Sequence, residues 1–171
     1  MSFKTEIKIE IKFDKKKLDK IFNSKNVTQK LNNQKSAKEI GPIVVDKMKK
    51  LIASGQSPIT GWPQRFEQYK ESYKKRILAK TYKKFSKRVT PVNLKLSGDF
   101  LKGLKSRFDL DQDGYAAVVF YTEEESPKEE GHRKGKNGQR KRPTIPIKNE
   151  TFRSAILTLI KQIYVKNFKL E

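Results

Sequence analysis

Residues 3–13 alternate strictly between bulky and charged side chains. Odd positions hold Phe, Thr or Ile, and even positions hold Lys or Glu. Successive side chains of a strand point to opposite faces, so the pattern predicts a half-buried β-strand. The polar, Asn-rich residues 23–35 are interpreted as a connection. Residues 1–35 are therefore expected to form an N-terminal strand followed by a polar connection.

The first helix is predicted over residues 36–53. Apolar side chains recur on one face of it at helical spacing: Ile40, Val44, Met48, Leu51 and Ile52. Ser36 and Glu39 have the spacing of a capping box, and Gly55 is a suitable stop. Gly41-Pro42 interrupts the pattern, so the helix either starts near Pro42 or bends there.

A second helical face is predicted from aromatic spacing in a very basic segment. The apolar positions follow one another at intervals of three or four: Phe66, Tyr69, Tyr73 and Ile77. Residues 70–88 hold nine Lys or Arg and one acid. Aromatics among cations can stack on bases while lysines neutralise phosphates, but an amphipathic helix gives the same pattern. We favour inward packing of the aromatics and keep the cations as candidate DNA contacts: Lys74, Lys75, Arg76, Lys80, Lys83, Lys84, Lys87 and Arg88.

A β-hairpin and a C-terminal helix complete the expected fold. Residues 105–110 and 115–121 have strand composition, and Asp113-Gly114 between them is a strong turn signal. The last helix is expected after Asn149 as N-cap, ending in a charged tail over residues 166–171. Its predicted buried stripe is Phe152, Ile156, Leu159, Ile160 and Ile163.

The element order predicts a single α+β domain. Strand, helix, helix, hairpin and helix follow one another, which favours an antiparallel β-sheet with helices packed on one face. The core is expected over residues 36–171, and it includes a long charged loop, residues 122–142, and the C-terminal helix.

Composition narrows the chemistry available to the chain. There is no Cys and one His, His132, which excludes disulfides, thiolate metal sites and a multi-His metal site within one chain. The D-x-D-x-D-G stretch ending at Gly114 matches the start of a calcium loop, but its twelfth position is Phe120 rather than a bidentate Glu. Nucleotide-binding loops, zinc-protease motifs and nucleophile elbows do not occur. We expect no enzyme activity, no metal and no cofactor.

The charge balance indicates the kind of partner. Forty Lys and Arg against 19 acids give a net charge of +21, which favours a polyanion: nucleic acid or an acidic protein surface. An AT-rich genome would also enrich Lys. No apolar run approaches the ~18 residues of a membrane span, and the N-terminus does not resemble a signal peptide. We therefore expect a protein of a reducing cytoplasm, without a membrane partner.

Two short segments carry a family signal. The first, PVNLKLSGDFLKGL, supplies Leu94, Leu96, Ser97, Gly98, Phe100, Leu101 and Leu104. The second contains Gly131 and ends in Arg142-Pro143 before the last helix. Thr144 follows Pro143, at a position where the family named next often has an aromatic residue. Together, over residues 36–165, they resemble the neck and tail-completion (head–tail connector) proteins of tailed bacteriophages, a family of small α+β subunits.

The resemblance implies a function without catalysis. Such a protein would be a structural virion subunit that forms a homo-oligomeric ring, a hexamer or dodecamer, at the head–tail junction. Its partners would be other neck, portal-adaptor or tail-tube proteins, with transient DNA contact as DNA passes. It would be assembled in the host cytoplasm and located in the virion. The alternative is a small basic nucleic-acid-binding protein.

The charged loop is the expected subunit interface. Residues 122–130 hold five Glu and one Lys, whereas residues 131–143 hold six Lys or Arg and no acid. Ring interfaces are head-to-tail, and a segment with both signs suits them as steering and register. We expect it to be mobile in the free subunit and to order on assembly; a solvated loop is the alternative. The candidate interface residues are Glu123, Glu124, Glu125, Glu129, Glu130, Arg133, Lys134, Lys136, Arg140, Lys141 and Arg142.

Overall fold

The computed structural model describes residues 27–63, 65–79, 89–94, 98–111, 114–135, 140–147 and 149–168. In chain order the elements are α2 (Val27–Ala53), α3 (Glu71–Leu78), α4 (Asp99–Lys102), β1 (Leu104–Asp111), β2 (Gly114–Tyr121), α5 (Ser126–Lys134) and α6 (Ser154–Phe168). Helices and a two-stranded antiparallel sheet make this an α+β fold, as predicted. The expected N-terminal strand over residues 3–13 lies outside the described residues.

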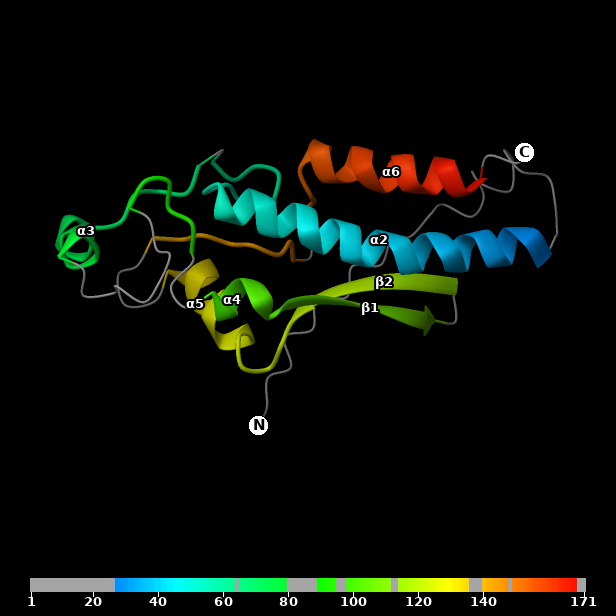
Figure 1. Ribbon diagram of the computed structural model, residues 1–171, viewed down its shortest axis with the longest axis horizontal. Coiled ribbons are helices and arrows are strands. Elements are labelled where there is room, and N and C mark those ends of the chain that lie inside the picture. The colour runs from blue at the N-terminus through cyan, green and yellow to red at the C-terminus, as the bar shows by residue number, and fades with distance from the viewer. Residues whose placement is uncertain are drawn as a thin grey trace.

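Helix α2 is the central layer of the molecule. It lies between the β1–β2 hairpin on one side and α6 on the other (Figure 1). The predicted stripe of α2 is confirmed at Ile40, Val44, Met48 and Ile52, which are almost completely buried. Its fifth member, Leu51, is partly buried and packs against the same core. Helix α6 contributes Ile156, Ile160 and Ile163 of the stripe predicted for it, with Leu159 partly buried, and these side chains join α2 and the hairpin in one hydrophobic cluster. Phe152, also predicted in this stripe, is buried but precedes the helix. The core is therefore organised around two sides of a single helix.

The central helix is longer than predicted. It begins at Val27, so residues 27–35 are helical rather than a connection, and Pro42 lies within the helix. Ser36 is not a cap: its buried hydroxyl accepts a hydrogen bond from Asn167 Nδ2 of α6 at 3.2 Å. The same amide donates to Glu39 Oε2 at 3.2 Å. The two residues that have capping-box spacing instead attach α6 to α2.

The hairpin agrees with its prediction. Strands β1 and β2 pair antiparallel in a register that runs from Leu104 opposite Tyr121 to Asp111 opposite Gly114. The connecting residues 112 and 113 lie outside the described residues. On the face toward α2, a Cβ added at Gly41 would lie 3.0 Å from the Ser106 side chain. Glycine at this position therefore allows the helix backbone to approach the sheet closely.

The C-terminal helix starts later than expected. Asn149 has a φ of 71° and is not its N-cap, because the chain first runs extended: Phe152 pairs with Ile59 in an antiparallel bridge. Thr60 N–H donates to the Thr151 carbonyl at 2.8 Å, which holds this stretch in place. Helix α6 then continues to Phe168, so residues 166–168 are helical rather than a tail.

Two predicted inward-facing aromatics are confirmed, although they precede the helix. Phe66 and Tyr69 are buried, whereas α3 begins only at Glu71 and contains no buried residue. Tyr73, the next in the series, meets the Tyr69 ring edge-on at 5.1 Å between centroids. Helix α3 lies at the end of the molecule remote from the C-terminal end of α6 (Figure 1).

Gly55 ends α2, as predicted, in the left-handed conformation with a φ of 82°. Its N–H donates to the Ile52 carbonyl at 3.0 Å and the Gln56 N–H donates to the Leu51 carbonyl at 2.9 Å, the pattern of a Schellman motif. A Cβ at Gly55 would lie 2.8 Å from Pro91 Cβ, whereas at Gly61, with a φ of 83°, it would meet nothing within 4 Å.

These two glycines provide a matched test of the packing at the end of α2. We expect Gly55→Ala to lower the free energy of unfolding by about 2–5 kcal/mol, because alanine adds left-handed strain and displaces Pro91. Gly61→Ala incurs only the strain, about 1–2 kcal/mol. Urea denaturation followed by circular dichroism measures both, and equal losses would contradict the steric role of Gly55.

Candidate functional site

The charged segment predicted as a loop contains a helix. Residues 126–134 form α5, which has Pro127 in its first turn, Glu129 near its start and basic residues in its last turn. Acids near a helix N-terminus and bases near its C-terminus complement the helix dipole. Glu130 and Lys134 pair at 2.5 Å with i,i+4 spacing. The separation of charge along residues 122–134 is therefore the signature of a helix, and residues 126–134 are helical rather than part of a loop.

Glu129 is the centre of a buried polar contact, although it was predicted at a subunit interface. Its side chain is 4% exposed, and it accepts hydrogen bonds from the Thr144 hydroxyl and, at 3.2 Å, from the Thr144 N–H. The Ile145 N–H approaches the same carboxyl group at 3.4 Å. Thr144 Oγ1 in turn lies 3.0 Å from the Tyr121 hydroxyl. We call this set of contacts the Glu129 anchor; it joins α5, residues 144–145 and β2.

Arg133 extends the Glu129 anchor toward the start of α6. Its guanidinium lies 3.4 Å from Glu129 and 2.9 Å from Glu150, and it donates to the Ile145 carbonyl. Glu150 also accepts a hydrogen bond from Trp62 Nε1 at 3.1 Å. Arg133 therefore connects two carboxylates within one subunit.

Arg142 is also internal, because its side chain is 3% exposed. Its N–H donates to the His132 carbonyl at 2.7 Å. Its guanidinium donates to the Glu67 carbonyl at 3.0 Å and lies 4.9 Å from the centre of the Tyr69 ring. Removing it would disturb the position of residues 67–69, so a reversed charge at Arg142 tests folding rather than assembly.

Burial divides the candidate interface residues into two groups. Glu125 is 5% exposed and pairs with Lys128 at 2.6 Å. Four candidates are thus used inside the subunit, which corrects their predicted role: Glu125, Glu129, Arg133 and Arg142. The candidates with exposed side chains are Glu123, Glu124, Lys134, Arg140 and Lys141. Glu130 is partly exposed, and Lys136 lies outside the described residues.

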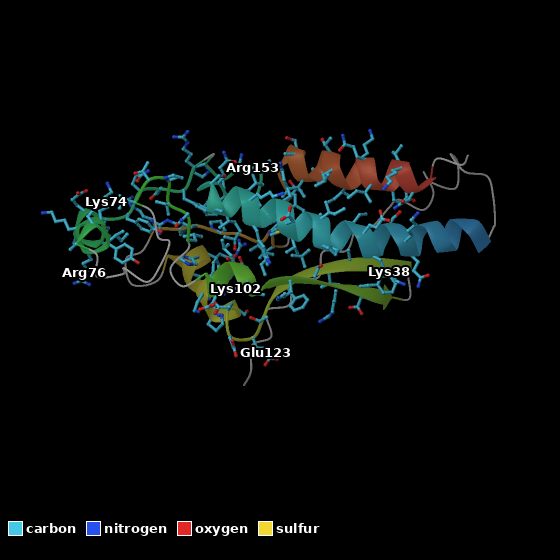
Figure 2. All side chains as sticks on the ribbon, in the orientation of Figure 1. Lys38, Lys74, Arg76, Lys102, Glu123 and Arg153 are labelled. Atoms are coloured by element: carbon cyan, nitrogen blue, oxygen red, sulfur yellow. The ribbon has the colours of Figure 1, made fainter. Side chains whose placement is uncertain are left out.

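Glu123 and Glu124 differ from the other acids whose side chains the structure describes. They occupy the turn between β2 and α5, and neither forms an ion pair or hydrogen bond with any residue that the structure describes. The other acids whose side chains the structure describes each have a polar partner in the chain. Figure 2 shows Glu123 at the edge of the molecule opposite α6. We call this pair the acidic turn.

The two segments with the family signal lie close together. Phe100 stacks on Tyr121, with ring centroids 4.7 Å apart and 15° between planes, and Tyr121 contacts Thr144, which follows Pro143. Phe100 also meets His132 edge-on at 5.0 Å. The motif residues Leu94, Phe100, Leu101 and Leu104 are buried. Gly98 adopts a φ of 92° and Gly131 lies in α5, while Leu96 and Ser97 lie outside the described residues.

The candidate DNA contacts are only partly described. Lys75 and Arg76 are exposed on α3, and Lys74 pairs with Glu71 at 3.3 Å. Figure 2 shows Lys74 and Arg76 at the α3 end of the molecule. The remaining candidates are not among the described residues: Lys80, Lys83, Lys84, Lys87 and Arg88.

Three further findings concern membrane-spanning helices, metal sites and similar proteins. Within the described ranges, no helix combines the length and apolar character needed to cross a membrane. Nowhere in that same part of the chain do three metal-ligating acids or histidines gather. No protein-family model, curated protein or solved structure matches the chain. The assignment of function therefore depends on the contacts and charges of the chain itself.

The Glu129 anchor makes stability depend on pH. Burial raises the pKa of Glu129 to about 7 from 4.5, although hydrogen bonds from Thr144 and the charge of Arg133 oppose the shift. The pKa of Glu129 is higher in the folded than in the unfolded protein, so the protonated carboxyl group stabilises the fold. This stabilisation is complete below about pH 4.5 and is lost as pH rises through 7. We expect roughly 3 kcal/mol of the free energy of unfolding to be lost across this range.

Glu129→Gln tests this directly, since glutamine retains hydrogen-bonding groups toward Thr144 but does not titrate. Urea denaturation at a series of pH values should show a flatter profile for this variant than for the wild type. Glu124→Gln removes an exposed carboxylate from the same segment and should leave the wild-type profile intact. Parallel profiles for Glu129→Gln and the wild type would refute the role of this carboxyl.

Proposed function

We propose that the chain is a structural virion subunit of a tailed bacteriophage that forms a ring at the head–tail junction, where DNA passes. In this role it is a neck, tail-completion or tail-terminator component and catalyses no reaction. One observation carries the proposal: the charged segment is divided between an internal anchor and exposed charges of opposite sign. The buried part fixes the shape of the subunit, and the exposed part is left for contacts with neighbours.

The packing of the family-like segments supports this proposal. Phe100, from the first segment, and Thr144, beside Pro143 of the second, both contact Tyr121. Residues far apart in the sequence thus form one structural unit at the base of the hairpin. A resemblance spread over two short segments has more weight when the segments depend on each other in three dimensions.

The exposed charges suit head-to-tail association. Glu123 and Glu124 are exposed at the β2–α5 turn, and Arg140 and Lys141 are exposed beyond α5. In a cyclic ring one surface of each subunit meets a different surface of the next, and complementary charges set register and approach. The net charge of +21 opposes association through general repulsion, which DNA in the lumen would offset.

A second candidate function is nucleic-acid binding by individual subunits. Helix α3 favours it, because the helix has no buried residue and exposes Lys75 and Arg76. Counterion release would make such binding fall with salt, with a log–log slope of about −0.9 per phosphate contacted on duplex DNA. Within a ring the same cations would face the DNA in the lumen, but DNA binding would not be the main function of the protein.

Self-association separates the two candidates. Light scattering coupled to size-exclusion chromatography, followed by electron microscopy of the assembled fraction, should show closed rings, with assembly increasing as protein concentration increases. The same samples with and without duplex DNA show whether a polyanion promotes assembly. A protein that stays monomeric at every concentration with and without DNA would contradict the ring and leave the nucleic-acid-binding function as the better account.

A further inference from the structure

An open groove lies where residues 57–67 meet residues 140–143. Its volume is about 280 Å³, enough for a few side chains but not for a folded partner. Its lining includes Ser57, Arg65, Glu67, Arg140, Lys141 and Pro143. Three of these side chains are cationic and one is acidic, so we call it the basic groove.

The walls of the basic groove are held in place by hydrogen bonds from Arg153, which lies outside the lining, and by one hydrogen bond between two lining residues. The Arg153 guanidinium donates to the carbonyls of Trp62 and Pro63, each at 2.9 Å. The Ser57 hydroxyl donates to the Pro143 carbonyl at 2.9 Å, which joins the two segments that form the groove. A site that is already shaped loses less conformational entropy when a partner binds.

The charges of the groove favour carboxylates as ligands. Arg140 already holds the carboxylate of Glu67 at 2.9 Å, so a carboxylate–guanidinium pair is accommodated there. Arg65 and Lys141 are exposed and form no ion pair with a described residue. The three cations and Glu67 leave the groove an excess of two positive charges, which one or two carboxylates would balance.

We infer that the basic groove binds the acidic turn of a second copy of this chain. Glu123 and Glu124 are exposed acids that lack a partner among the described residues in a protein with a large excess of cations. Within one subunit neither of these acids forms an ion pair with a cation of the groove.

This contact is head-to-tail, because each subunit presents a groove to one neighbour and a turn to the other. Repeated contacts of this kind close into a ring or continue as a filament. The inference rests on the proposed self-assembly and adds to it the two surfaces that meet. It assigns the acidic and basic residues exposed by the charged segment to opposite sides of one interface.

Two charge-reversed variants test the pairing. The turn variant carries Glu123→Lys and Glu124→Lys; the groove variant carries Arg65→Glu and Lys141→Glu. Each alone presents like charges at every contact, so self-association should weaken at least about tenfold. In an equimolar mixture the intact groove of one variant faces the intact turn of the other, and the two reversed surfaces also match. The mixture should therefore assemble although neither component does.

Matched controls account for the change in net charge. Lys161→Glu with Lys166→Glu, on the exposed face of α6, gives the charge change of the groove variant. The double substitution Asp46→Lys and Glu71→Lys gives the charge change of the turn variant. Both acids are exposed and belong to ion pairs within their own helices. Circular dichroism confirms folding in each case. If the variants assemble like the wild type, or if their mixture does not regain assembly, the inference is wrong while the ring proposal stands.

Two other outcomes have distinct meanings. A wild-type protein that never self-associates overturns both the ring and this contact. If the groove variant assembles normally but loses affinity for a short single-stranded DNA at low salt, while the α6 control retains it, the groove is a nucleic-acid site and the inference is refuted. Sedimentation velocity for assembly and fluorescence anisotropy for DNA binding provide the two measurements.

Discussion

The buried carboxyl group of Glu129 is the constraint on which the charged half of the molecule depends. Thr144 and Ile145 donate to it, and Arg133 lies beside it. A buried carboxylate is costly unless hydrogen bonds and an opposite charge compensate it. Helix α5 has few apolar residues to bury, so these contacts hold it against the segment that leads to α6.

Fixing α5 in this way also determines which charges remain outside. The side chains that stabilise the subunit face inward, and the acidic turn and the rim of the basic groove face solvent. The shape of the groove depends on Arg142, which donates to the Glu67 carbonyl, and on Arg153, which donates to the carbonyls of Trp62 and Pro63. The charged segment thus supplies both contacts inside the subunit and the exposed charges that we propose meet a neighbouring subunit.

The core elements were predictable because their signal is local. The stripe of α2 and the Asp-Gly hairpin both follow from short-range periodicity and turn chemistry. The start of α2 was missed because its first residues are polar, although extending a helix is easier than nucleating one. Asn149 was a plausible cap, but the bridge between Ile59 and Phe152 keeps the chain extended beyond it.

The site was predictable only in part, for a physical reason. Glu123, Glu124, Arg140 and Lys141 are exposed as an interface requires, but sequence could not separate them from Glu129 and Arg142. Burial of those two depends on Thr144 and on the Glu67 carbonyl, which are distant in the chain. Pro127 and the i,i+4 spacing from Glu130 to Lys134 were the available signals of α5.

Hydrogen–deuterium exchange of the unassembled protein, with residue resolution, tests the central claim that the charged segment is anchored within the subunit. The Thr144 and Ile145 amides, which donate to Glu129, and the amides of the last turn of α5 should exchange slowly, with protection approaching that of α2. Exchange of these amides as fast as that of an unstructured peptide would contradict the account.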